Sequence, residues 1–358
     1  MQKKGNELSF IGQNIYVGID VHLKSWIITI MLEHSDFKTL SINPEAKALK
    51  LYLDKHFPQG NYYSAYEAGF TGYSTHWELK NEGIQNIVVN PADIPTTDKE
   101  RKQKEDKRDS RKIAKTLRAG DLQSIYIPKV ETMELRALVR YRKTLVKEIS
   151  RNKNRIKSFL YCNGINIPPT ISVASRHWSG KFTQWLESLT FTTEFGKQVL
   201  DQHLKITTFL RKSLLDVNKE LRKLKTAGPY SKSINLLCSI PGIGLIIATT
   251  LLSEIEDFKR FKNLSRFCSF VGLIPTTNSS GEKDVTGKIT SRSNKPIRTV
   301  IIEAAWIATR NEPVLAKKFN ELCGRMKPNE AIVRIAKKLL SRIRSVMINE
   351  KQYEYCTI

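Results

Sequence analysis

Four acidic residues stand where their carboxylates could work together. Asp20 ends the apolar run IYVGID, and Glu67 ends a second run, YYSAYE. A carboxylate at the end of a buried strand is costly unless it has a compensating partner, and a metal ion is one such partner. Asp106 and Asp109 are three residues apart, so on a helix their side chains share a face. Together these acids predict a site for Mg²⁺ or Mn²⁺, ions that accept oxygen ligands.

Each acid also has a simpler interpretation when it is taken alone. Asp20 could cap a strand or a turn, and Glu67 could pair with a lysine. Asp106 and Asp109 lie among basic residues, where salt bridges on a solvated helix face are common. The combination of all four acids in one strongly basic chain favours the metal site.

The charge of the chain indicates the kind of substrate. Its 358 residues include 59 Lys and Arg against 35 Asp and Glu, so the formal net charge is +24. A field this positive attracts polyanions and releases counterions when nucleic acid binds. Two metal ions can stabilise the attacking and leaving oxygens of a phosphoryl displacement. The sequence therefore predicts chemistry on a DNA phosphodiester.

The cysteines and the apolar runs indicate the compartment. The five cysteines are odd in number, and no two stand at the spacing of metal ligands, which fits a reducing cytosol. The first residues, MQKKGNELSFIGQ, lack the apolar run of a signal peptide, and no stretch approaches the length of a membrane span. We expect a soluble cytoplasmic protein without membrane partners, associated with the nucleoid of a bacterial or archaeal cell during its action.

The first region, residues 1–128, has the pattern of an α/β domain. Short apolar runs at 15–20, 26–31 and 39–42 predict strands, and a helix is expected from Pro44. A strand, a helix and a strand then alternate up to residue 90, which indicates a mixed sheet. A charged helix within 105–120 follows and carries Asp106 and Asp109. Three basic residues of this segment are predicted to contact nucleic acid: Lys104, Lys107 and Arg108.

The middle region, residues 129–227, is predicted to contain two long helices, at 131–163 and 193–226. Their apolar residues recur at intervals of three, four and seven, as in a coiled coil. An antiparallel hairpin is the simplest structure; an intermolecular coiled coil and two ordinary packed helices are the alternatives. The first helix is strongly basic, and its predicted contacts to a nucleic-acid backbone include Arg140, Arg151 and Arg155.

The third region, residues 228–358, reads as mostly helical, with a polar loop from 275 to 294. The segment Pro-Gly-Ile-Gly lies between two predicted helices and has the form of a helix-hairpin-helix. Gly242 and Gly244 would let backbone amides approach a phosphate at a helix N-terminus. A tight turn without a ligand is the alternative.

Three blocks of the sequence are similar to those of a known family. VGIDVHLKSW, YEAGFTGY and KEDKRDSRKIA resemble the RuvC-like domain, of RNase H fold, in DEDD-type insertion-sequence transposases. Asp20, Glu67, Asp106 and Asp109 fall on the four acids of that family. The resemblance extends over nearly the whole chain and implies a transposase domain at the C-terminal end.

The resemblance also gives the polar loop a role, because the family has a nucleophilic serine there that links covalently to DNA. Ser280, followed by glycine, is the matching position, and the adjoining Ser279 is the alternative. A serine that attacks phosphorus needs its proton removed and the phosphoryl charge neutralised. Ser293 stands where the family usually has glycine. Four basic residues could supply the positive charge: Lys283, Lys288, Arg292 and Arg298.

The function implied by the resemblance is cut-and-rejoin recombination of an insertion sequence. The acids and the serine would form one composite site, and strand exchange would need a homo-oligomer, a dimer or a tetramer. A structured guide RNA would pair with donor and target DNA. Two alternatives stay open: a metal-dependent, structure-selective endonuclease of the Holliday-junction type, and a non-catalytic nucleic-acid-binding protein.

Overall fold

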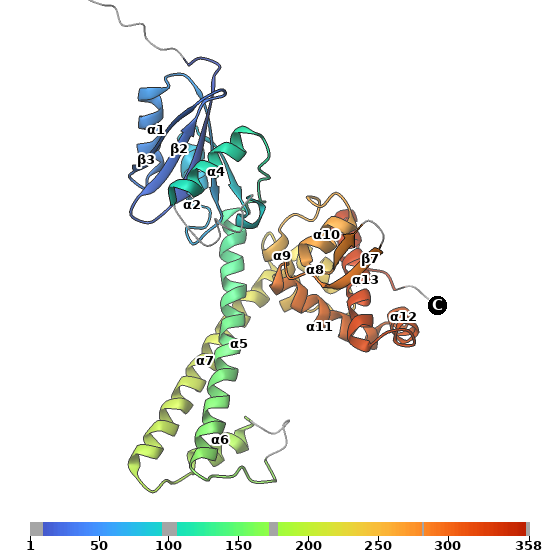
Figure 1. The fold of residues 1–358 in the computed structure, drawn as a ribbon. Helices are drawn as coiled ribbons and strands as arrows, with labels where there is room; N and C mark the ends of the chain where they lie inside the picture. The colour runs from blue at the N-terminus through green and yellow to red at the C-terminus, as the bar shows by residue number, and fades with distance from the viewer. Residues whose placement is uncertain (1–9, 95–105, 172–177, 281–282, 356–358) are drawn as a thin grey trace, which may run out of the picture. The chain divides into compact units, whose positions relative to one another are not determined.

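The computed structural model describes residues 10–94, 106–171, 178–280 and 283–355, which are drawn in colour in Figure 1. The chain divides into two compact units, Met1–Ile127 and Pro128–Ile358. Each unit has its own hydrophobic core. The division into three domains at residues 128 and 227 stays a prediction.

A five-stranded mixed sheet with the order β3-β2-β1-β4-β5 forms the centre of the first unit. Its strands are β1 (Asn14–Val21), β2 (Trp26–Met31), β3 (Asp36–Ile42), β4 (Asn61–Glu67) and β5 (Gln85–Val89). The first three strands form an antiparallel meander, while β4 and β5 run parallel to β1. The predicted mixed α/β fold is confirmed, and its order is consistent with an RNase H-like domain.

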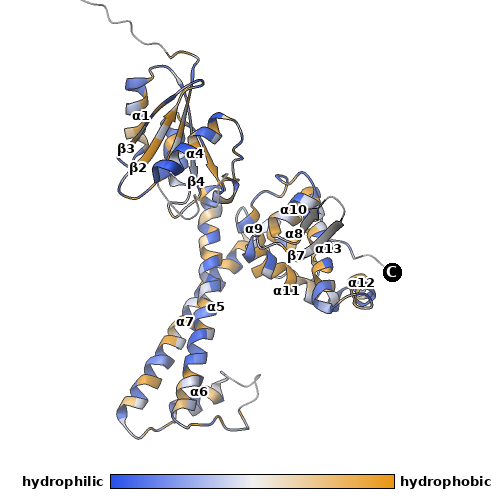
Figure 2. Cartoon of the chain, in the orientation of Figure 1, coloured by the Kyte–Doolittle hydropathy of each residue, from blue (hydrophilic) through white to orange (hydrophobic). Residues whose placement is uncertain are grey.

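Helices cover both faces of this sheet. α1 (Ala46–His56) and α2 (Ser74–Asn81) pack on one face, where alternate residues of β1 join the larger core. α4 (Asp106–Arg118) packs against β1 and β2 on the other face. Figure 2 shows β2 as mainly hydrophobic and much of α4 as hydrophilic. α4 therefore buries a narrow apolar stripe and leaves its charged residues outside.

Gly18 lets α4 lie directly on the backbone of β1. A Cβ atom at this position would stand 2.1 Å from the carbonyl oxygen of Ser110 and 2.3 Å from the nitrogen of Ala114, both on α4. The Ser110 hydroxyl also lies 2.9 Å from the hydroxyl of Thr29 on β2, in a buried hydrogen bond. At the far end of α4, Arg118 donates to the carboxylate of Asp36 over 3.0 Å. These contacts fix the helix that carries Asp106 and Asp109.

The close approach at Gly18 predicts a steric effect. Gly18→Ala should push α4 away from β1 and lower the free energy of unfolding by about 1–3 kcal/mol, the usual cost of overpacking. Urea denaturation measures this change. Gly180→Ala is the matched control, because a Cβ atom there would have nothing within 4 Å. Equal stability of the two variants would contradict the packing role of Gly18.

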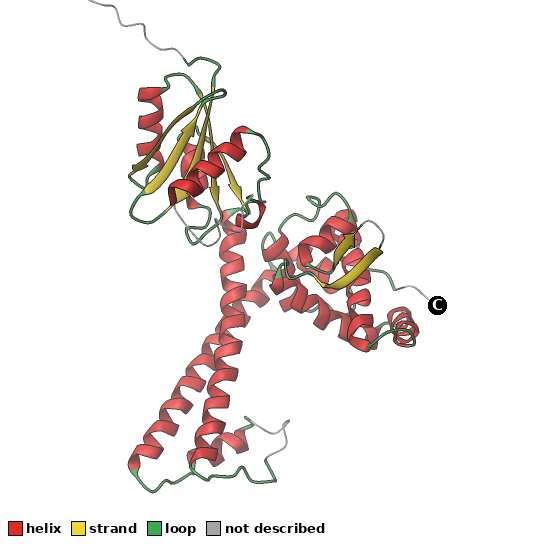
Figure 3. Ribbon diagram, viewed as in Figure 1, coloured by secondary structure: helices red, strands yellow, loops and turns green. Residues whose placement is uncertain are grey.

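Helices dominate the second unit (Figure 3). They are α5 (Val130–Cys162), α6 (Gly180–Glu187), α7 (Glu194–Thr226), α8 (Ser231–Cys238), α9 (Leu245–Ile255), α10 (Leu264–Val271), α11 (Lys295–Asn311), α12 (Pro313–Cys323) and α13 (Pro328–Asn349). None of the described helices is both long and apolar enough to cross a membrane.

The prediction of a plain loop from 275 to 294 was wrong. β6 (Pro275–Ser280) and β7 (Lys283–Ile289) form an antiparallel hairpin there. The physical reason is that Thr, Val and Ile recur through this polar segment, and β-branched residues favour strands. Ser279 and Ser280 end β6, where their backbones pair with Asp284 and Lys283.

α5 and α7 pack side by side and antiparallel (Figure 1). Leu135 and Val139, early in α5, share a cluster with Val217 and Leu221, late in α7. A polar layer lies between this cluster and a second one that contains Ile156 and Leu160 of α5. This arrangement is a helical hairpin; coiled-coil packing in the strict sense stays a prediction.

The polar layer centres on Asn152, whose side chain is buried. Its amide donates to the hydroxyl of Thr207 over 2.7 Å and to the carbonyl of His203 over 2.8 Å. Its oxygen lies 2.7 Å from Nδ1 of His203. A single buried polar layer specifies the register of paired helices at some cost in stability.

Asn152→Leu should lower the free energy of unfolding by about 1–3 kcal/mol, because His203 and Thr207 would lose a buried partner. Adding His203→Leu should recover most of that loss, since removing both partners leaves fewer unsatisfied groups. Denaturant unfolding of the single and double variants gives the comparison. A double variant no more stable than the single one would show that the polar layer is not the cause.

Candidate metal centre

Asp20 and Glu67 lie on adjacent parallel strands at the same edge of the sheet. Ile19 of β1 is in register with Tyr66 of β4. Asp20 and Glu67 are the next residues on these two strands, so they lie beside each other. Because side chains alternate between the two faces of a sheet, the Asp20 side chain points to the same face as position 18, and Gly18 touches α4 on that face. The Glu67 side chain likewise points to the same face as Ala65, which packs in a small apolar cluster with Ile113 of α4. The sheet therefore directs both acids to the face that α4 covers.

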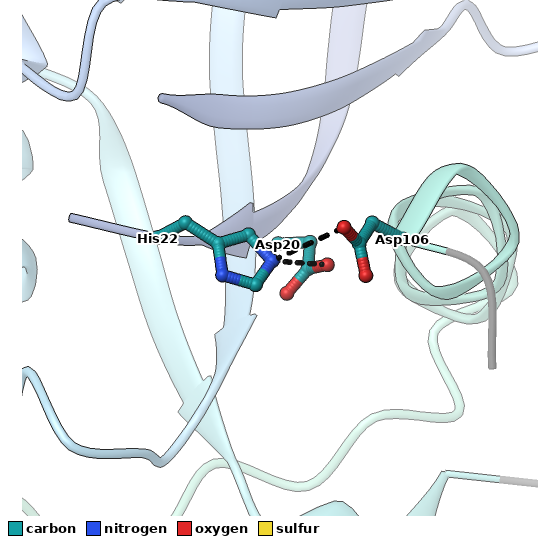
Figure 4. Close-up of side chains that lie close together, drawn as sticks. All are labelled: Asp20, His22 and Asp106. Atoms are coloured by element: carbon teal, nitrogen blue, oxygen red, sulfur yellow. Dashed lines mark hydrogen bonds and ion pairs between the residues drawn. The ribbon is translucent and has the colours of Figure 1, made fainter. Parts of the chain in front are cut away.

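α4 brings two further acids to this place from its first turn. Asp106 faces the end of β1, as Figure 4 shows. Among the described residues, ligand atoms of Asp20, His22 and Asp106 lie within 4.8 Å of one another. Asp109 is near enough for its charge to act on Asp20. The structure thus brings together acids that are up to 89 residues apart in the sequence, from Asp20 to Asp109.

The pKa of the Asp20 carboxyl group is raised above its usual value, chiefly by burial. Burial raises the pKa of this carboxyl group, and the charges of Asp106 and Asp109 raise it further. His22 opposes the rise through charge and a hydrogen bond. A divalent cation would offset the repulsion among these carboxylates, because an opposite charge favours the ionised form.

The residues present fit a hard divalent cation. The side chain of Asp20 is 19% exposed and that of Asp106 is 50% exposed, so the centre is partly shielded and still open to water and substrate. Carboxylate oxygens are the ligands that Mg²⁺ and Mn²⁺ accept, and Mg²⁺ usually keeps several waters. Asp20 and Asp106 would hold the ion. Glu67 and Asp109 are not in this group of ligand atoms, so their part in metal binding stays a prediction.

His22 is the residue that the sequence analysis missed. It follows Asp20 by two positions, and its Nε2 lies 3.1 Å from the Asp20 carboxylate and 3.6 Å from that of Asp106. The sequence contained a signal for this histidine, the pattern Asp-x-His at a strand end. Residues i and i+2 of a strand share a face, so this pattern places the histidine beside the acid.

The basic residues predicted near the acids have different positions. Lys107 and Arg108 are exposed on the first turn of α4. Lys104 lies outside the described residues. The exposed positions leave the two described side chains accessible to a phosphate backbone, and contact with nucleic acid stays a prediction for all three.

On α5, Arg140 has a partner within the protein. It donates two hydrogen bonds, of 2.7 and 2.9 Å, to the buried carboxylate of Glu254 on α9. Burial raises the pKa of Glu254, but hydrogen bonds from Arg140 and Asn294 and the arginine charges outweigh it, so the pKa is lowered. Glu254 thus joins α5, through Arg140, to Asn294 at the start of α11. The side chain of Arg140 is still 56% exposed, so a nucleic-acid contact stays a prediction.

Arg151 and Arg155 are exposed farther along α5. Arg151 donates to Glu148 over 2.7 Å on the same helix. Exposed pairs of this kind contribute little to stability, so Arg151 can exchange its partner for a phosphate at small cost.

The glycines of the Pro-Gly-Ile-Gly turn have separate structural roles. Gly242 has a positive φ of 84°, and a Cβ atom there would stand 2.4 Å from the carbonyl oxygen of Ala304 on α11. Gly244 is exposed and precedes α9. The turn therefore packs against α11 through Gly242, while Gly244 faces open space. A phosphate-binding helix-hairpin-helix stays a prediction.

Arg298 lies on α11 and is anchored to the backbone next to the hairpin of β6 and β7. It donates to the carbonyl of Thr290, just beyond β7, over 2.8 Å. Arg292 is exposed in the turn before α11. Lys283 and Lys288 belong to β7.

Comparisons with known proteins agree with this architecture. Residues 17–162 match the profile of a transposase family, the DEDD transposases of IS110 type. Residues 234–320 match that of the transposase IS116/IS110/IS902 family. The two matched segments include all four acids and both serines.

Individual relatives are similar over most of the chain. The transposase for insertion sequence element IS1533 of Leptospira borgpetersenii is 27% identical over 305 residues, covering 82% of this chain and 85% of the relative. The putative transposase y4qE of Sinorhizobium fredii is 29% identical over 259 residues, covering 72% of this chain and 60% of the relative. The putative transposase y4rJ of the same organism is 27% identical, covering 91% of this chain and 90% of the relative.

Proposed function

We propose that this chain, which belongs to the IS110/IS116 family of transposases, cuts and rejoins the DNA of an insertion sequence with a metal centre and a serine nucleophile. The observation that supports this most directly is the convergence of the acids. Asp20 and Glu67 come from adjacent strands, and α4 adds Asp106 and Asp109 on the same face.

In this proposal the four acids hold one or two divalent ions against the scissile phosphate. When bound, Mg²⁺ or Mn²⁺ neutralises the charge that develops on the phosphoryl oxygens. Asp20 and Asp106 would hold the ion that contacts the phosphate, and the packing of α4 on Gly18 keeps the two carboxylates together. A misplacement of about 1 Å in such a site can cost about 10²-fold in rate.

The nucleophile in this proposal is the hydroxyl of Ser280. Its Oγ forms a bond to phosphorus as its proton leaves, and the bond from phosphorus to one deoxyribose oxygen breaks. The released DNA end carries a free hydroxyl, and the phosphoserine ester keeps the energy needed for rejoining. Ser279 is the alternative nucleophile. Lys283, Lys288, Arg292 and Arg298 would balance the negative charge.

The remaining partners follow from the charge and from the family. We propose that the basic face of α5, including Arg151 and Arg155, binds a nucleic-acid backbone, and that a structured guide RNA pairs with donor and target DNA. Strand exchange requires two broken strands at once, so we propose a homo-oligomer whose contact includes α5 and α7. The acids of the first unit and the serine of the second would form one composite site.

The test is a strand-exchange assay with the full-length protein. It is purified from cells that contain its element, bound RNA is sequenced, and labelled element ends are incubated with the protein and Mg²⁺ or Mn²⁺. The proposal expects a discrete RNA from the flank of the gene, covalent protein–DNA adducts and recombined products. Metal-dependent cleavage with free ends and no adduct would instead favour a Holliday-junction-type endonuclease. DNA binding without any product would favour a non-catalytic protein.

A further inference from the structure

We propose that His22 is a nitrogen ligand of the ion held by Asp20 and Asp106, and that it makes this centre select Mn²⁺ over Mg²⁺. This inference rests on the metal centre of the proposed function and identifies which ion the centre prefers.

The position of His22 is set by the strand that carries Asp20. β1 ends at Val21, so His22 leaves the strand on the same face as Asp20. In Figure 4, the ring nitrogen Nε2 faces a carboxylate oxygen of Asp20 and one of Asp106, and dashed lines mark both contacts. The side chain is 39% exposed, so the ring needs no rearrangement of the core to meet an ion.

The distances fit the edge of a coordination octahedron. In an octahedral site with bonds of about 2.1 Å, neighbouring ligand atoms stand about 3.0 Å apart. Nε2 of His22 lies 3.1 Å from Oδ2 of Asp20 and 3.6 Å from Oδ2 of Asp106. All three ligand atoms lie within 4.8 Å of one another. A cation inserted among them would need only small movements of the side chains.

A nitrogen ligand changes the selectivity of the centre. Mg²⁺ requires near-ideal geometry and takes oxygen ligands. Mn²⁺ also favours oxygen ligands, but as a first-row transition ion it tolerates one imidazole better than Mg²⁺ does. To bind through Nε2, the ring must carry its proton on Nδ1. A centre with carboxylates and one imidazole should therefore bind Mn²⁺ more tightly than an all-oxygen centre does, relative to Mg²⁺.

The simpler explanation is that His22 only forms an ion pair with the two acids. A histidine that donates a hydrogen bond to carboxylates would compete with a cation, and its removal would strengthen metal binding. A ligand would have the opposite effect, because its removal weakens Mn²⁺ binding. The two roles therefore predict changes of opposite sign.

The experiment uses the full-length protein with Mn²⁺ alone, without DNA. Electron spin-echo envelope modulation detects a nitrogen bound directly to Mn²⁺, and calorimetry gives the affinities for Mn²⁺ and Mg²⁺. We expect nitrogen modulation in the native protein and its loss in His22→Gln. In His22→Gln the preference for Mn²⁺ over Mg²⁺ should fall at least about tenfold. Even residues that only hydrogen-bond to a metal ligand change metal affinity by that factor when they are replaced.

Two further variants complete the design. His34→Gln removes an exposed histidine of the same unit and should keep the nitrogen signal. His22→Asp supplies an oxygen ligand at the same place and should keep Mn²⁺ binding without the nitrogen signal, with the preference shifted toward Mg²⁺. Circular dichroism checks that each variant is folded.

The outcomes separate this inference from the proposed function. Mn²⁺ binding without nitrogen modulation in the native protein, or tighter Mn²⁺ binding in His22→Gln, would overturn the role of His22 and leave the metal centre intact. Failure of the native protein to bind Mn²⁺ would overturn both, and Asp20→Asn would then show no further loss.

Discussion

Asp20→Asn is expected to lower metal-dependent DNA cleavage by about 10²–10³-fold, the loss seen when a stabilising contact to the developing charge is removed. Asparagine has nearly the same shape but carries no negative charge. The Asp20 side chain is only 19% exposed and belongs to the group of ligand atoms with His22 and Asp106, so its loss removes a carboxylate from the centre itself. Rates of adduct and product formation with labelled DNA measure the effect.

The control for this substitution is Asp121→Asn, just after α4 in the same unit. Asp121 is exposed and outside the cluster of ligand atoms, so its loss should leave cleavage within about twofold, as for most surface changes. Calorimetry with Mn²⁺ adds a second readout, in which Asp20→Asn should weaken binding and Asp121→Asn should not. Native cleavage rates in Asp20→Asn would remove the basis for the metal centre.

Ser280→Ala is expected to abolish covalent protein–DNA adducts, a loss on the order of 10⁴-fold or more for a nucleophile. The alanine side chain has no oxygen to attack phosphorus, while the acids of the first unit remain. Adducts are measured as protein-linked radiolabelled DNA after denaturation and are removed by protease. Metal binding should be unchanged in this variant, because the acids and the serine belong to different units.

Ser279→Ala is the natural control, since the two serines adjoin at the end of β6. It should keep the adduct. The reverse result would assign the nucleophile to Ser279. Adducts that persist in both single variants and in the double variant would rule out a serine nucleophile.

Much of the fold was predictable because local patterns and the tertiary structure agree. The strands at 26–31 and 62–67 and the two long helices follow from apolar periodicity, and their ends deviate by at most one residue. The hairpin of β6 and β7 was not predicted, because polar residues obscure its strand pattern. α6 was missed because it is short and lies in a connector that contains prolines.

The sequence alone determined the chemistry that this protein can attempt: a strong positive charge, four acids at strand and helix ends, and a Ser-Gly pair in a polar segment. Residue types carry charge, ligand atoms and nucleophiles, so these properties need no coordinates. Only the tertiary structure decided that α4 lies on Gly18, which brings Asp106 to Asp20, and that His22 contacts both acids. Such proximity depends on packing between residues far apart in the chain, and local periodicity contains no information about which helix covers which face.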